Sequence, residues 1–197
     1  MKKLIGLKKF SKFYTAVFIS GTGSNLENLI KFSLLNKSPI KVILVISSNT
    51  KAKGLKLAKK YNIPFKTFRF INKIKDEKKI LFYLKKNKIK IICLAGFMKI
   101  LSENFIKKFN GKILNIHPSL LPKYKGLNTH ERTIKNNEKF SGCTVHYVNS
   151  KLDSGKIILQ KKIKIYKKDT PKTLAKRILK HEHIIYPKAL MKIFSNH

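Results

Sequence analysis

The chain has 197 residues, of which 43% are hydrophobic, so it can bury one full apolar core and is too apolar for a disordered chain. Its formal net charge of +36 suggests nucleic-acid binding. However, the 45 basic residues include only Arg69, Arg132 and Arg177, and the other 42 are lysines. Arginine is the residue that suits bidentate recognition of phosphates and bases. The scattered lysines, with abundant Ile and Asn, are typical of an AT-biased genome, while steering of an anionic substrate or nonspecific polyanion binding stays open.

Along the first part of the chain, short runs rich in β-branched or aromatic residues alternate with runs of helical spacing. The predicted strands are residues 13–20, 40–47, 64–68, 90–95 and 112–116. The predicted helices are residues 24–35, 51–61, 75–87 and 102–109. This alternation predicts a single Rossmann-like α/β domain, with a mostly parallel twisted sheet and helices on both faces.

After Gly126 the pattern changes to a helix at 128–135, strands at 142–148 and 156–165, and a long final helix. Thr170 and Pro171 are a suitable cap and first-turn pair for that helix, which runs towards Phe194. The two late strands flank a turn, so we expect an antiparallel edge of the sheet. Residues 1–12 are predicted to be a basic N-terminal extension, and residues 13–197 the folded domain. The absence of a signal-peptide pattern or a membrane-spanning run predicts a cytoplasmic location.

A loop rich in glycine and small polar residues, Ser20–Asn25, lies between the first predicted strand and helix. Free N–H groups at the start of a helix suit an anion. Leu26 stands where a dinucleotide fingerprint needs a third glycine, and no Gly-Lys-Ser/Thr run follows, so a single phosphate is favoured over NAD or ATP. Ser24 or Asn25 could cap the helix or donate to that phosphate. An ordinary strand–helix turn is the alternative.

The fourth strand ends in Gly96-Phe97-Met98, at the edge of the sheet where open α/β folds bind ligands. These residues could form a flat apolar slot for a ring such as a pterin, or they could be core residues. Cys93 and Cys143 lack cysteine neighbours at metal-ligand spacing and are predicted to be buried thiols.

The fifth strand ends in Asn115 and His117, which strand alternation places on one side, with Ile116 on the other. Asp153 follows a later strand, in a chain with only three Asp and six Glu residues. An amide, a protonatable imidazole and a carboxylate are the groups needed when an amine attacks a carbonyl and negative charge develops on its oxygen. A structural His and a turn Asp are the alternatives.

Two residues of the later chain, Glu182 and His146, have open roles. Glu182 could bind a sugar hydroxyl or an amine, or it could be a solvated helix residue. His146 could support the site or pack in the core. His181 and His183 lack the four-residue spacing of a helical metal pair, so no metal is predicted.

Five segments in this order resemble those of the phosphoribosylglycinamide formyltransferases, which use 10-formyltetrahydrofolate in purine biosynthesis. They are I-S-G-T-G-S-N-L, L-A-G-F-M-K-I-L-S, L-N-I-H-P-S-L-L-P-K-Y-K-G, G-C-T-V-H-Y-V-N-S-K-L-D-S-G-K-I-I-L-Q and H-E-H-I-I-Y-P. The resemblance covers about residues 14–194 and implies the formyltransferase fold. It also implies a monomer or homodimer that acts on two small molecules, glycinamide ribotide and 10-formyltetrahydrofolate, with no metal, specific nucleic acid or membrane.

The resemblance also implies roles for individual residues. The implied catalytic residues are Asn115, His117 and Asp153. The implied ribotide-binding residues are Gly23, Ser24, Asn25 and Glu182. The implied folate-binding residues are Lys73, Met98, Lys99, Ile100, Leu101, Asn115, Asn149, Ser150, Lys151, Leu152 and Asp153. Ser150 replaces a usual acid, and Lys99 and Asn128 replace a usual Arg and His, which affects the folate-tail contacts rather than the chemistry.

Two other classes of function are compatible with the sequence. A methionyl-tRNA formyltransferase or a formyltetrahydrofolate hydrolase could share the Asn-His-Asp core. We expect the first to carry a further C-terminal domain and the second an N-terminal one. A polyanion-binding module is the alternative from a different class, and scarce arginine counts against it.

Overall fold

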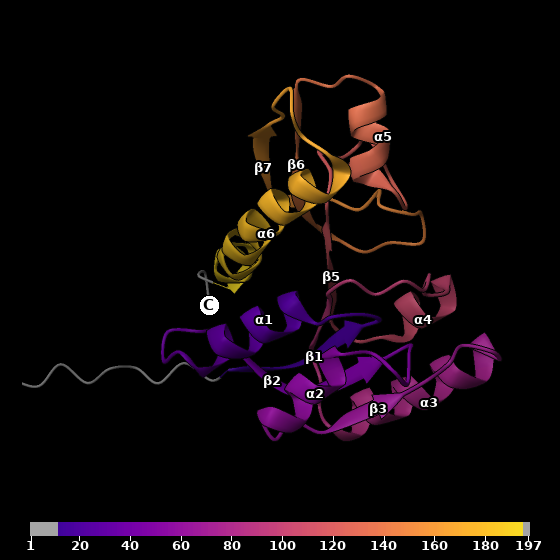
Figure 1. Ribbon diagram of the computed structural model, residues 1–197. Coiled ribbons are helices and arrows are strands. Elements are labelled where there is room, and N and C mark those ends of the chain that lie inside the picture. The colour runs from indigo at the N-terminus through magenta and orange to yellow at the C-terminus, as the bar shows by residue number, and fades with distance from the viewer. Residues whose placement is uncertain (1–11, 195–197) are drawn as a thin grey trace, which may run out of the picture.

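The computed structural model describes residues 12–194, and within them seven strands form one sheet (Figure 1). Their order across the sheet is β3-β2-β1-β4-β5-β6-β7. The strands are β1 (Phe13–Ile19), β2 (Ile40–Ser47), β3 (Phe65–Thr67), β4 (Ile91–Leu94), β5 (Lys112–His117), β6 (Phe140–Tyr147) and β7 (Ile157–Lys164). Strands β1 to β5 pair in parallel, whereas β5–β6 and β6–β7 are antiparallel. The predicted mostly parallel sheet with an antiparallel edge is therefore confirmed. Apart from Lys12, the predicted extension lies outside the described residues.

Helices cover both faces of the sheet, as predicted. They are α1 (Ser24–Leu34), α2 (Gly54–Lys60), α3 (Lys73–Lys86), α4 (Glu103–Lys108), α5 (Thr129–Lys135) and α6 (Pro171–Phe194). Helices α1, α2 and α6 pack into the core on one face, and α3 and α4 into the core on the other. The central strand β1 is buried on both faces: Val17 and Ile19 face the first core, and Ala16 and Phe18 the second. Its sequence is therefore continuously apolar.

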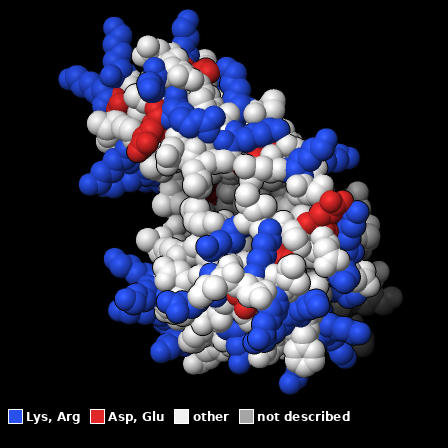
Figure 2. Space-filling view, turned by 90° about the vertical axis from the view of Figure 1, so that its right-hand side faces the viewer, with Lys and Arg blue, Asp and Glu red and all other residues white. Residues whose placement is uncertain are grey.

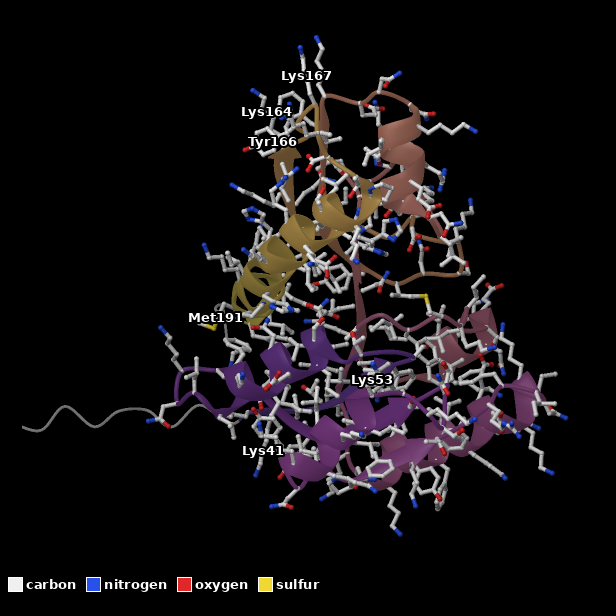
Figure 3. The ribbon with its side chains drawn as sticks, in the orientation of Figure 1. Lys41, Lys53, Lys164, Tyr166, Lys167 and Met191 are labelled. Carbon is white, nitrogen blue, oxygen red and sulfur yellow. The ribbon has the colours of Figure 1, made fainter. Side chains whose placement is uncertain are left out.

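The edge strand β7 carries more charged residues than β1, because only part of β7 is buried. Lys161, Lys162 and Lys164 are exposed along it, and such charges discourage pairing with another chain. Lys164 and Lys167 project outward at this end of the molecule, and Lys41 at the opposite end (Figure 3).

The start of α1 corrects one expectation. Neither Ser24 nor Asn25 caps the helix; the cap is Gly23, with φ +83° and no side-chain hydrogen bond. A Cβ on Gly23 would lie 2.6 Å from the Cα of Gly54, so the close approach of two loops requires glycine here. Helix α3 starts two residues before its predicted position because the side chain of Asn72 accepts the N–H of Lys75 at 3.0 Å.

The strand order places a topological switch point beside β1. From β1 the chain builds β2 and β3 on one side, then returns to add β4 and β5 on the other. In open α/β sheets, ligands bind where the loops diverge beyond the carboxyl ends of such strands. The loops after β1, β4 and β5 therefore define the region in which a site is expected.

Candidate active site

A cavity of about 590 Å³ opens at this edge of the sheet. It brings together most of the residues that the sequence singled out. Those in its lining are Asn25, Met98, Lys99, Ile100, Leu101, Asn115, His117, Asn149, Ser150, Lys151, Leu152, Asp153 and Glu182. Three predicted site residues do not line it. Gly23 and Ser24 lie at the N-terminus of α1, and Lys73 is exposed at the first residue of α3.

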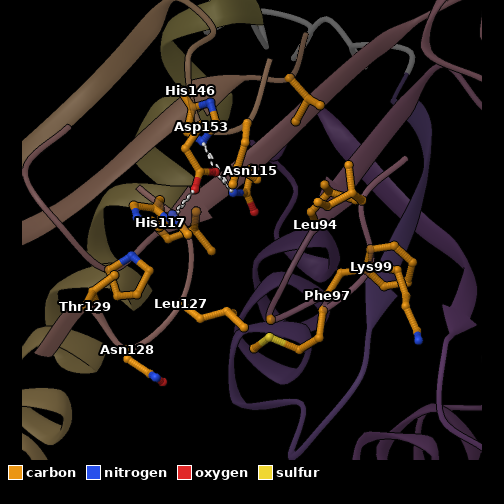
Figure 4. Close-up of a pocket in the computed structure, with 18 of the residues that line it drawn as sticks. Leu94, Phe97, Lys99, Asn115, His117, Leu127, Asn128, Thr129, His146 and Asp153 are labelled. Atoms are coloured by element: carbon orange, nitrogen blue, oxygen red, sulfur yellow. Dashed lines mark hydrogen bonds and ion pairs between the residues drawn. The ribbon is translucent and has the colours of Figure 1, made fainter. Parts of the chain in front are cut away.

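Strand β5 delivers Asn115 and His117 to the cavity from one face, as strand alternation predicted. Their neighbours Leu114 and Ile116 point into the core on the opposite face. Figure 4 shows both polar side chains converging on Asp153, which comes from the loop between β6 and β7.

Asp153 is the centre of this cluster, and its side chain is only 8% exposed. One carboxylate oxygen, Oδ2, lies 3.3 Å from His117 Nδ1 and accepts the N–H of Gly126 at 2.9 Å. The other, Oδ1, accepts from Asn115 Nδ2 at 3.4 Å. These partners are remote in the sequence, so a simple turn aspartate does not account for the contacts. Asp153 has a left-handed φ of +44°, and its carboxylate lines the cavity.

The ring of His117 is held by acceptors at both nitrogens. Its Nε2 lies 2.8 Å from the carbonyl oxygen of Tyr124, so Nε2 carries a hydrogen and donates it. The other ring nitrogen, Nδ1, faces Asp153. The Tyr124 hydroxyl donates to Glu138 Oε1 at 2.9 Å, which braces the loop carrying that carbonyl.

His146 supports Asn115 from the neighbouring strand, where the two residues are register partners. Its Nδ1 donates to the Tyr147 carbonyl at 2.8 Å, and burial lowers the pKa of its imidazole. The neutral ring therefore presents a lone pair at Nε2, 3.3 Å from Asn115 Nδ2. Of the two sequence interpretations, support of the site is the one that this contact favours.

A second polar pair joins α1 and α6 within the cavity lining. Asn25 Nδ2 donates to Glu182 Oε2 at 2.7 Å, and both residues are buried. Burial raises the pKa of the Glu182 carboxyl, against the opposing effect of the Asn25 hydrogen bond. The Asn25 Oδ1 atom is buried without a hydrogen-bond partner among the described residues. Buried polar atoms are almost always paired, so this acceptor is suited to a donor on a bound molecule. Glu182 is therefore not the solvated helix residue of the alternative interpretation.

Apolar side chains surround the opening of the cavity. Met98 is 63% exposed there, with Ile100, Leu127 and Leu152 also exposed. Phe97 packs inward against Phe18, at 5.3 Å between ring centroids. Phe97 therefore fits both interpretations, because it packs against the core and also lines the cavity, whereas Met98 is exposed at the cavity. Lys99 points away from the Asn-His-Asp cluster (Figure 4).

Sequence reasoning missed several lining residues. His130 on α5 lines the cavity, and its pKa is lowered by burial and then by the nearby His117. Leu127, Thr129 and Lys172 also line it. None of these residues directly follows a strand, so the expectation of a site at the strand ends did not indicate them. The carbonyl of Tyr124 and the N–H of Gly126 left no signal, because any residue has those groups.

On the face of the molecule in Figure 2, the charged side chains are spread out rather than gathered into one patch. Figure 2 shows lysine and arginine side chains over the whole visible face, while the hollow between its two lobes is mostly uncharged. Within residues 12–194, no group of three or more His, Cys, Asp and Glu side chains could hold a metal ion. No helix in the same range is long and apolar enough to cross a membrane.

The fold and the site define a class of protein. It is an α/β domain with an amide, an imidazole and a carboxylate gathered at its switch point, beside a cavity large enough for a small molecule. Residues 14–190 match the formyl transferase family, and the chain belongs to that family.

Individual relatives sharpen this assignment. The chain is 43% identical over 175 residues to phosphoribosylglycinamide formyltransferase of Haemophilus influenzae, covering 87% of this chain and 82% of that protein. A crystal structure of phosphoribosylglycinamide formyltransferase from Brucella melitensis has a TM-score of 0.87 and 41% identity, covering 95% of this chain and 97% of that one. The resemblance predicted from the sequence is confirmed.

Some relatives are much longer. The human trifunctional purine biosynthetic protein adenosine-3 is 42% identical over 187 residues, which are 93% of this chain. This chain spans only 18% of that protein.

Proposed function

We propose that this protein transfers the formyl group of 10-formyltetrahydrofolate to the amine of 5′-phosphoribosylglycinamide, as a step of purine biosynthesis. The observation that carries the proposal is the convergence of Asn115, His117 and Asp153 in the lining of one cavity. The family and the names of its relatives support the same reaction.

The amine attacks the formyl carbon directly, and negative charge develops on the formyl oxygen. A C–N bond forms to the amine, the bond from the formyl carbon to N10 of the folate breaks, and N10 leaves with a proton. The amine gives up one proton, so the products are formylglycinamide ribotide and tetrahydrofolate. Asn115 and His117 supply the hydrogen bonds that the oxyanion needs.

The geometry suits these roles. The Asn115 amide makes only long contacts, at 3.3 Å and 3.4 Å, so a closer oxyanion can take its hydrogens. His117 keeps one N–H on the Tyr124 carbonyl, and its contact from Nδ1 to Asp153 Oδ2 is long, at 3.3 Å, so a closer oxyanion can share the Nδ1 hydrogen. Asp153 stabilises the protonated ring and orders a water that relays the amine's proton.

The cavity and the adjoining N-terminus of α1 suit the two substrates. Exposed apolar residues at the opening, among them Met98 and Leu152, fit a flat ring system such as that of the folate. The free N–H groups at the start of α1 fit the ribotide phosphate, and the buried Asn25–Glu182 pair fits hydroxyl or amine donors. The cytoplasmic location and a monomeric or dimeric state stay sequence predictions.

The test is the release of tetrahydrofolate on mixing the protein with 10-formyltetrahydrofolate and one acceptor. Glycinamide ribotide is expected to support rapid release, whereas water and unformylated methionyl-tRNA are expected to support little. Faster release with water would make the protein a hydrolase, and faster release with the tRNA would make it a tRNA formyltransferase. Equal background rates with all three acceptors would remove the proposed activity.

A further inference from the structure

Ser20 connects two loops that the proposed function assigns to different substrates. It follows β1, and its loop leads into the N-terminus of α1, where we place the ribotide phosphate. The N–H of Met98, in the folate-binding loop after β4, donates to Ser20 Oγ at 2.8 Å. The N–H of Ser20 donates to the carbonyl of Gly96 at 3.1 Å. Two hydrogen bonds therefore tie these loops together beside the switch point.

The hydroxyl of Ser20 is itself held in place. Its Oγ lies 2.6 Å from Ser48 Oγ, and the N–H of Ser48 donates to the carbonyl of Ile19 at 3.0 Å. A hydroxyl has one hydrogen and two lone pairs, so Ser20 can bond to Ser48 and still accept from Met98. Because β2 and β4 flank β1 on opposite sides, Ser20 is braced from one neighbouring strand and holds the loop of the other.

The folate-binding loop needs such an anchor at this point. Gly96 turns the chain with a φ of +70°, and the Met98 side chain that follows is mostly exposed. A side chain with so little packing does not fix its own backbone. The hydrogen bond to Ser20 therefore holds the Met98 N–H at the cavity, one residue beyond the packed ring of Phe97.

We propose that Ser20 is a positioning residue that couples the two substrate subsites. A ribotide phosphate bound at α1 fixes the loop that begins with Ser20, and the Ser20 hydroxyl then fixes the backbone at Met98 before the folate binds. Ordering a loop in advance removes part of the cost of binding the second ligand. Such coupling is reciprocal, so the folate must tighten ribotide binding by the same factor. The expected factor is about two- to tenfold, the range that corresponds to one net hydrogen bond. This inference rests on the proposed function.

The experiment measures binding rather than turnover. The dissociation constant of tetrahydrofolate is determined with and without saturating glycinamide ribotide, a pair that cannot react because no formyl group is present. The ratio of the two constants is the coupling factor. It is compared in the wild type, in Ser20→Ala and in the matched control Ser48→Ala, which keeps the Met98–Ser20 hydrogen bond. Ser20→Cys, with a side chain close in size and a weak acceptor, is a second variant in case Ser20→Ala does not fold.

The wild type is expected to show the coupling. Ser48→Ala should keep most of it, because Ser20 Oγ can still accept from the Met98 N–H without its brace, and Ser20→Ala and Ser20→Cys should show a ratio near one. A wild-type ratio of one overturns the inference, and so does a folded Ser20 variant that keeps the wild-type ratio. Loss of the coupling in Ser48→Ala to the same extent also overturns it, because the Met98 contact would then not be the cause. The formyl-transfer assay on the wild type separates this failure from failure of the proposed function.

Discussion

The cavity holds two buried carboxylates whose surroundings differ. Asp153 is within reach of an imidazole, an amide side chain and a backbone N–H. Glu182 accepts a hydrogen bond from Asn25, whose own carbonyl oxygen is unpartnered among the described residues, and burial raises the pKa of Glu182. The first region is already organised for chemistry by the protein itself. In the second region the Asn25 carbonyl oxygen still needs a hydrogen-bond donor, which a ligand can supply.

The largest expected effect comes from removing either of the two oxyanion donors that we propose, Asn115 and His117. Asn115→Ala and His117→Ala should each lower kcat by about 10²–10³ while the protein stays folded. Asn104→Ala, on an exposed position of α4, is the control and should keep wild-type turnover. Single-turnover formyl transfer measures the chemical step directly. Near-wild-type rates in either active-site variant would contradict the assigned role.

A change at Asp153 tests whether its charge, rather than its hydrogen bonds alone, serves His117. Asp153→Asn keeps an acceptor for the Gly126 N–H but removes the negative charge next to Nδ1. The rate should fall about 10- to 100-fold, because a hydrogen bond to a charged partner is replaced by one to a neutral amide. If the single-turnover rate of the variant equals that of the wild type, the pairing is wrong.

Changes at Glu182 should affect both stability and ligand binding. Burial makes its ionised carboxylate unfavourable for the free energy of folding, whereas the same carboxylate can accept hydrogen bonds from the ligand. Glu182→Gln should raise KM for the ribotide about tenfold or more, with a smaller change in kcat. The raised pKa also predicts that the wild type loses free energy of unfolding as the pH rises from the ordinary value of 4.5 towards the raised one. The Gln variant has no such loss, so its stability advantage should grow across that window and then stay constant.

Urea unfolding between pH 4 and pH 8 measures this difference. A stability difference that does not change with pH would show that Glu182 is not buried in its ionised form. A Gln variant with unchanged KM would remove Glu182 from the ribotide site.

The sequence could predict the features that depend on local patterns, and it could not predict those that depend on loop conformation. The parallel half of the sheet follows from local patterns, since strands buried on both faces must be continuously apolar, and all five predicted parallel strands are present. Alternation on β5 also placed Asn115 and His117 on one side. The contacts that complete the site depend on loop conformation. The carbonyl of Tyr124 and the carboxylate of Asp153 reach His117 only because both residues adopt a left-handed φ, which neither residue type requires.

Tertiary contacts between distant elements explain the other misses. Asn25 was considered as a cap for α1, but its side chain bonds instead to Glu182 on α6, 157 residues later. His130 lies in the cavity because α5 is docked there, and the helical pattern of 128–135 gave no indication of which ligand cavity it would face.

The smallest expected effect concerns a carboxylate outside the cavity lining, which serves as a reference for the two within it. Asp169 is paired with Arg177 and accepts the N–H of Tyr166 at 2.7 Å, and the guanidinium is the main cause that lowers its pKa from 3.8 to about 2. A lowered pKa stabilises the fold above the unfolded value and is lost as the pH falls towards the folded one. Asp169→Asn should therefore lower the free energy of unfolding by about 1 kcal/mol at neutral pH, because Arg177 is partly exposed and the pair is screened. Urea unfolding should show this deficit unchanged from neutral pH down to about 5 and shrinking below about 4, with kcat near that of the wild type. A deficit that persists undiminished at pH 3 would show that the variant disturbs packing at the start of α6 rather than an ion pair.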